Sequence, residues 1–181
     1  LEKQLTVLGV LGEDTLKDAT PALKLKELVY DKFRGVKRVQ VVIRLPETAK
    51  LRAQELQKEL STFEPLKYLT FAFGSVDDIK EVYTNLKSSK ALRSDLSSNE
   101  VFIIDKEKHQ RGRLDDRTKA QKEENFPMYG MTSYNVLEVS ELKNKMSEDI
   151  RILCTEYRQK LKGNFRSTTS RADDILNNEI N

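Results

Sequence analysis

Three short, mainly apolar runs along the chain predict the strands of a sheet. They are Leu5 to Leu11, Val39 to Leu45 and Leu69 to Phe73. The second run is almost continuously apolar and rich in β-branched residues, which is typical of a strand covered on both faces. We therefore expect a buried sheet with helices on both of its sides.

Between these runs, apolar residues recur at the spacing of helices. Thr20 before Pro21 is typical of a helix start with threonine as the cap, and Pro46 is expected to open a second helix. Ser75 followed by Asp78 predicts a capping box at the start of a third helix. This alternation of strand and helix favours parallel pairing of the strands.

The second half of the chain predicts an antiparallel hairpin and a long helix. The apolar run Val101 to Ile104 is expected to pair with Arg111 to Leu114 across a polar turn. Apolar residues then recur from Val139 to Leu161, and without regular flanking charges this helix is expected to pack on the sheet rather than form a coiled coil. The predicted fold class is α/β, with a central mainly parallel sheet, a late antiparallel hairpin and helices on both faces.

Two polar segments stand outside this pattern. Residues 1–162 are expected to form one domain with an insertion at 115–134, and residues 163–181 a polar tail. Aromatic residues and methionine in a polar segment are typical of interaction surfaces, although the insertion could also pack on its own domain. The candidate interaction residues are Phe126, Met128, Tyr129, Met131 and Tyr134 in the insertion, and Ile175, Leu176 and Ile180 in the tail. The tail could dock on this domain, on a second copy or on a partner.

The charge distribution argues against nucleic acid as a partner. The 32 basic and 29 acidic side chains nearly cancel, and the most basic segment is interrupted by acidic residues. No apolar run approaches the ~20 residues needed to cross a bilayer. The chain begins at Leu1 rather than Met, so we expect a preceding segment that could act as a membrane tether.

The chain holds few residues that could carry metal or redox chemistry. It has one cysteine, Cys154, expected as a small apolar side chain on the last helix, and one histidine, His109, expected in a solvated turn. The acidic residues considered as a cation or acid/base site are Glu13, Asp14, Asp18, Asp115 and Asp116, and we expect them to be ordinary helix-start or solvated side chains. The sequence thus predicts no catalytic residue, no metal ligand, no cofactor and no small-molecule substrate.

Four stretches resemble the Sco/SenC family of copper-handling assembly proteins, which have a thioredoxin-like fold. They are LVYDKFRGVKRVQVVIRLPETAKL (28–51), LTFAFGSVDDIKEVY (69–83), VFIIDKEKHQRGRLDD (101–116) and LEVSELKNKMSEDIRILCTEYR (137–158). The resemblance covers about two-thirds of the chain. It implies a thioredoxin-like domain on the extracytoplasmic, periplasmic side, associated with a membrane complex.

The copper chemistry of that family does not carry over to this chain. The resemblance places the family's Cys-x-x-x-Cys motif near Asp14 to Thr20 and its histidine near Ser94 to Glu100, and neither stretch contains these residues. Cu(I) requires soft ligands such as thiolates, and a dithiol reductase needs two sulfurs. Leu45 also replaces the aspartate of the family's Asp-Pro-Glu turn.

These observations predict a non-catalytic Sco-like binding or assembly module, not an enzyme, with a protein partner or a membrane complex. The first alternative is a copper or thiol-redox assembly factor of a respiratory oxidase that uses Cys154 or ligands supplied by a partner. The second is a cytosolic interaction protein that shares only its architecture with the Sco/SenC family.

Overall fold

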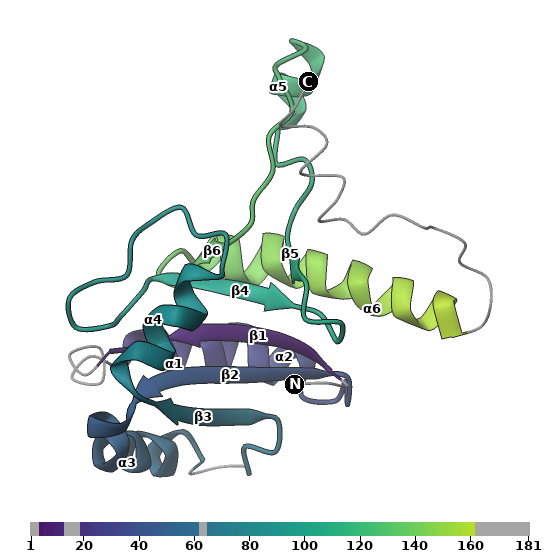
Figure 1. Cartoon of the computed structure of the whole chain (residues 1–181). Helices are drawn as coiled ribbons and strands as arrows, with labels where there is room; N and C mark the ends of the chain where they lie inside the picture. The colour runs from purple at the N-terminus through teal and green to yellow at the C-terminus, as the bar shows by residue number, and fades with distance from the viewer. Residues whose placement is uncertain (1–3, 13–18, 62–64, 162–181) are drawn as a thin grey trace.

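The protein has a six-stranded mixed sheet with the strand order β3-β2-β1-β4-β5, and β6 pairs with β4 beside this path (Figure 1). The structure, a computed structural model, describes residues 4–12, 19–61 and 65–161. Strands β1 (Leu5–Val10), β2 (Val39–Pro46) and β3 (Leu69–Gly74) are parallel. Strand β4 (Glu100–Ile104) is antiparallel to β1, and β5 (Gln110–Arg111) and β6 (Tyr134–Asn135) are antiparallel to β4. This is the predicted thioredoxin-like arrangement, with β3 added at the parallel edge.

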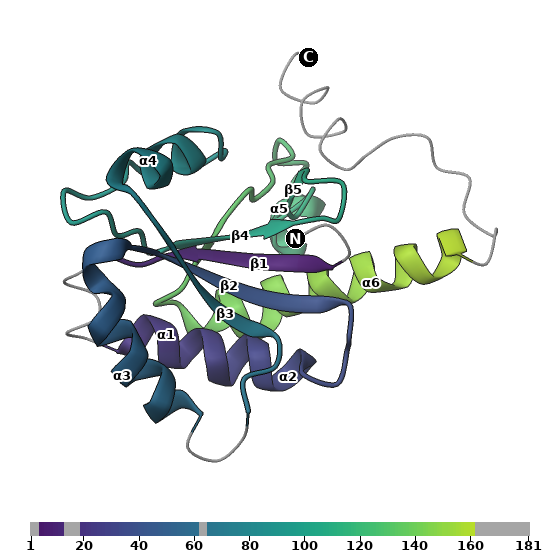
Figure 2. The same ribbon diagram turned by 60° about the horizontal axis from the view of Figure 1, so that its bottom comes forward.

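Helices cover both faces of the sheet, as predicted (Figure 2). One face carries the larger core and is covered by α1 (Thr20–Leu25), η2 (Lys26–Tyr30), α2 (Asp31–Phe33), α3 (Lys50–Leu60), η4 (Glu141–Met146) and α6 (Ser147–Leu161). Among the helices of the described ranges, α4 (Val76–Thr84) covers the opposite face. There Ile79 packs with Val10 and Phe102 in a smaller core. The last helix therefore packs on the sheet, which removes the coiled-coil alternative for its described residues.

The helix starts agree with the sequence in one case and differ in two. The capping box is confirmed, since Ser75 N donates to Asp78 Oδ2 at 2.9 Å and Asp78 N donates to Ser75 Oγ at 3.1 Å. Thr20 is not the cap of α1, because Ala19 occupies that position and Pro21 lies in the first turn. Pro46 is the last residue of β2, and the 3-10 turn η3 (Glu47–Ala49) separates it from α3.

The predicted hairpin forms, but it is shorter than expected. Ile103 pairs with Arg111, after which the chain leaves the sheet, so residues 112–114 do not pair with β4. The buried Asp105 closes the turn, because its carboxylate accepts from His109 N at 2.9 Å and from Arg111 Nε at 2.6 Å. Lys108 has a φ of 70°, a left-handed conformation that this tight turn requires.

Several predictions concern residues outside the described part of the chain. These residues are Glu13, Asp14 and Asp18 before the first helix, and Ile175, Leu176 and Ile180 in the tail. The proposed docking of the tail stays a prediction. Within residues 4–12, 19–61 and 65–161, no helix combines the length and apolar character needed to cross a membrane.

Candidate functional site

The loop before β4 packs directly on the end of β1. Ser98 N donates to Val10 O at 3.0 Å, and a Cβ on Gly12 would lie 1.9 Å from Asp95 O. The fold thus places residues 94–100, where the family resemblance puts the histidine, beside residues 10–12 at the end of β1. The loop presents a hydroxyl and a carboxylate there, with Ser97 Oγ donating to Asp95 Oδ1 at 2.7 Å. Neither group is a soft metal ligand.

Cys154 and His109 lie on different elements and have different surroundings. Cys154 is half-buried on α6 and packs against the larger core, where burial raises the pKa of its thiol despite the charges of Arg158 and Arg38. His109 lies in the exposed β4-β5 turn, with Nδ1 3.7 Å from Asp105 Oδ2. In the described ranges, no three His, Cys, Asp or Glu side chains converge as a metal site.

Residues 113–133, which we call the arm, project from the antiparallel end of the sheet (Figure 1). Its two legs are held together by paired backbone hydrogen bonds between Arg113 and Met131, at 2.9 and 2.8 Å, and by a third from Asp116 N to Tyr129 O at 2.8 Å. A short helix, α5 (Lys119–Glu123), forms near the tip and has its own capping box. The predicted insertion is therefore an ordered element rather than a structureless loop.

Ion pairs fasten the base of the arm to η4 and α6. Arg113 Nε donates to Asp149 Oδ2 at 3.2 Å, and Arg113 also pairs with Glu148. Burial lowers the pKa of Arg113, but hydrogen bonds and charges from Glu148 and Asp149 outweigh it and raise that pKa. Lys145 Nζ lies 2.6 Å from Asp116 Oδ2. The outgoing leg of the arm thus has charged contacts with both η4 and α6.

The acidic pair at the start of the arm is not simply solvated, contrary to the expectation from sequence. Asp116 pairs with Lys145, as above. Asp115 accepts from Arg117 Nε at 2.9 Å and lies 3.2 Å from Lys122 Nζ. The hydrogen bonds from Arg117 hold the pKa of Asp115 well below its ordinary range. These carboxylates organise the arm and are not a free acid/base pair.

The five candidate interaction residues of the insertion divide into two groups. Phe126, Met128 and Tyr129 are 51%, 45% and 44% exposed and lie on the leg that returns from α5. Met131 is half-buried and packs against the larger core. Tyr134 is only 1% exposed, because it lies in β6 beside β4, and its hydroxyl donates to Asp149 Oδ2 at 2.8 Å. Tyr134 is therefore a core residue of the domain.

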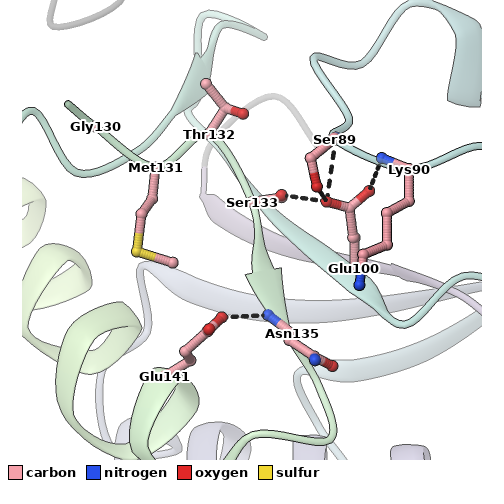
Figure 3. A pocket seen from close by; sticks show the side chains of 9 residues that line it. All are labelled: Ser89, Lys90, Glu100, Gly130, Met131, Thr132, Ser133, Asn135 and Glu141. Carbon is pink, nitrogen blue, oxygen red and sulfur yellow. Dashed lines mark hydrogen bonds between the residues drawn. The ribbon is translucent and has the colours of Figure 1, made fainter. Parts of the chain in front are cut away.

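A pocket that the sequence did not predict lies between the arm base and the loop after α4 (Figure 3). Its volume is about 280 Å³. Ser89, Lys90 and Glu100 lie on one side of it, and Met131 and Glu141 lie on the other. The pocket therefore joins the first residue of β4 to the arm and to the start of η4.

Glu100 is 4% exposed, yet it is surrounded by donors that stabilise its charged form. Six donor groups lie within hydrogen-bond distance of its carboxylate: Tyr83 OH, Ser88 Oγ, the amide and hydroxyl of Ser89, the amide of Lys90, and Ser133 Oγ. Burial raises the pKa of Glu100, but the hydrogen bonds from Ser133, Ser88 and Ser89 outweigh it and lower that pKa to about 2. Glu100 is thus a buried, ionised carboxylate at neutral pH.

The sequence contained a weak signal for this site. Glu100 directly precedes the apolar run of β4, where a charged side chain needs a specific explanation. The serines that surround it come from residues 88 and 89 and from residue 133 in the arm. Only the fold brings these two segments to the same carboxylate.

No family model matches the chain, and no curated protein matches its sequence. Among solved structures, the chain is similar to the crystal structure of yeast Sco1, with 15% identity over 82% of this chain and 85% of that one, and a TM-score of 0.44. It is also similar to a yeast mitochondrial 1-Cys peroxiredoxin, with 13% identity over 92% of this chain and 72% of that one, and a TM-score of 0.44. The strand order of the sheet carries the thioredoxin-like assignment, and neither likeness extends to chemistry or partners.

Proposed function

We propose that the protein is a non-catalytic, thioredoxin-like binding or assembly module that engages a protein partner through its arm. The observation that carries this proposal is the exposure of Phe126, Met128 and Tyr129 on a projecting, ordered arm. The family resemblance in the sequence further supports a membrane-associated complex on the extracytoplasmic side as the place of action.

The composition of the arm suits an interface. Aromatic side chains and methionine are enriched at protein interfaces, and a few such residues usually carry most of the binding energy. Much of the charge on the arm is already paired internally, as in the contacts of Asp115 with Arg117 and of Lys119 with Glu123. Phe126, Met128 and Tyr129 are the large apolar side chains of the arm that a partner can contact.

The attachment of the arm also supports a binding role. Its legs are joined by backbone hydrogen bonds, and its base is fastened by Arg113 and Lys145. A segment that is ordered before binding loses less conformational entropy when a partner docks. We therefore expect the exposed residues to be presented in nearly the geometry that the partner meets.

The test compares co-purification from native membranes by three forms of the intact chain. They are the wild type, the double variant Phe126→Asp and Tyr129→Asp, and the control Leu51→Asp, whose side chain is 79% exposed on α3. Removing hot-spot side chains typically costs about 2 kcal/mol each, so the double variant should lose its specific partner. The control should retain that partner. Equal recovery by all three forms contradicts a role for the arm.

The copper or thiol-redox alternative has less support. A single cysteine cannot form an intramolecular dithiol, and Cys154 is half-buried with a raised thiol pKa. Cu(I) titration of the purified domain against a competing chelator tests this alternative. Retention of one Cu(I) per chain would overturn the non-catalytic assignment, whereas retention of none agrees with it.

A further inference from the structure

We propose that the pocket lined by Glu100 binds a cationic group on an aliphatic stem, such as the ammonium of a lysine side chain. The inference goes beyond the proposed function, because it concerns a pocket at the arm base rather than the exposed residues near the arm tip. It requires no knowledge of the partner.

The carboxylate of Glu100 is a buried charge without a cationic partner among the described residues. All six donors around Glu100 are neutral hydroxyls or amides, so they disperse its negative charge without cancelling it. No cationic side chain of the described residues forms an ion pair with Glu100. Buried charges in proteins are normally paired, so the charge of Glu100 favours a cation in the adjoining pocket.

The pocket presents several hydrogen-bond acceptors to a cation. Ser133 Oγ and Ser89 Oγ each donate to Glu100 at 2.6 Å, so their oxygens are polarised and become better acceptors for a further donor. Glu141 faces the same pocket and accepts from Asn135 N at 2.6 Å through one carboxylate oxygen. Its other oxygen remains available to a cation. The pocket thus offers two hydroxyl oxygens and a second carboxylate.

The size of the pocket and its apolar wall fit an aliphatic stem. The pocket volume of about 280 Å³ suits a single long side chain and is small for a cofactor. Met131 forms one wall, and methionine adapts readily to an aliphatic chain (Figure 3). The methylenes of a lysine side chain would lie against Met131 while the ammonium reaches Glu141 and Ser133.

Lys90 is the cationic residue of the pocket lining. Its ammonium could itself neutralise Glu100, and this alternative can be distinguished from binding of an external cation. Its backbone amide donates to Glu100, but its exposed ammonium makes no ion pair with any described residue. If the Lys90 ammonium supplied the missing charge in solution, Lys90→Met would create binding that the wild type lacks. The present proposal instead expects the wild type itself to bind.

The test is a titration of the intact chain with two cationic probes and one neutral probe. Binding is monitored through the backbone amide chemical shifts in NMR spectra. The probes are N-acetyl-lysine methylamide, n-butylamine and N-acetyl-norleucine methylamide, which has the stem without the charge. Both cationic probes should shift the amides of Ser133 and Asn135, with a Kd of about 1–10 mM, and norleucine should not. Tighter binding of the lysine probe indicates a side chain of a partner as the source, and equal binding indicates a free amine.

Two variants complete the test. Glu141→Gln keeps an acceptor for Asn135 N and removes the charge, so it should weaken the lysine probe about tenfold. Glu138→Gln, an exposed change outside the pocket lining, should not. Absence of shifts with both cationic probes overturns the proposal, as does equal binding of norleucine or binding that appears only in Lys90→Met. The probe titrations do not test the variants at Phe126 and Tyr129. This proposal and the proposed function can therefore fail separately.

Discussion

Replacement of Glu100 by Gln should destabilise the protein and change how its stability depends on pH. The hydrogen bonds from Ser133, Ser88 and Ser89 lower the pKa of Glu100 from 4.5 to about 2. Such a shift corresponds to about 3 kcal/mol of preference for the ionised form in the folded state. A glutamine amide would also place its own N–H donors against the amides of Ser89 and Lys90. We therefore expect Glu100→Gln to lose about 2–4 kcal/mol at neutral pH.

The sign of the pH effect follows from the lowered pKa. Because the folded pKa lies below the unfolded one, the stabilisation is fully present above pH 4.5 and is lost as the pH falls toward 2. Between neutral pH and pH 3.5, the wild type should lose about 1.4 kcal/mol through this residue, and Glu100→Gln should not show that loss.

Urea unfolding followed by circular dichroism at several pH values measures both effects. Glu81→Gln, a change of an exposed carboxylate on α4, serves as the matched control and should keep the wild-type dependence. The reasoning is refuted if Glu100→Gln is as stable as the control at neutral pH, or if its stability falls with acid as steeply as that of the wild type.

Two further predictions concern the arm and the thiol. Gly112→Ala should lower the free energy of unfolding by more than about 2 kcal/mol and displace the arm, because the added Cβ would lie 2.0 Å from Met131 O. Thermal unfolding measures this loss. In the control Gly35→Ala, the added Cβ meets nothing within 4 Å, so this variant should be nearly as stable as the wild type. Cys154 should react with iodoacetamide at pH 7.5 about tenfold more slowly than free cysteine, since burial raises the pKa of its thiol. Unfolding in urea should restore the rate of free cysteine. Equal rates without urea would show that the thiol is accessible.

Most of the sheet could be predicted from local patterns. The parallel strands are marked by apolar runs, and the alternation with helices determines their pairing. The capping box at Ser75 and Asp78 was also visible, because both of its partners lie within one helical turn. These features depend on residues that are close in the sequence.

The arm and the Glu100 pocket could not be predicted in the same way. Tyr134 resembles other aromatic residues of a polar segment, and only its pairing with Val101 across β4 and β6 shows that it is buried. The contacts of Arg113 with Asp149 and of Glu100 with Ser133 span 36 and 33 residues. Polar contacts between distant segments leave no periodic pattern, so their partners become apparent only in the folded structure.

The most direct test of the central claim is site-specific photo-crosslinking in native membranes. A photoreactive residue is placed at Met128, which is 45% exposed on the arm, and in a separate control at Leu51 on α3. The account predicts one discrete crosslinked protein from position 128 and none from position 51. Crosslinking of the same protein from both positions, or of none from position 128 while the partner still co-purifies, would contradict binding through the arm.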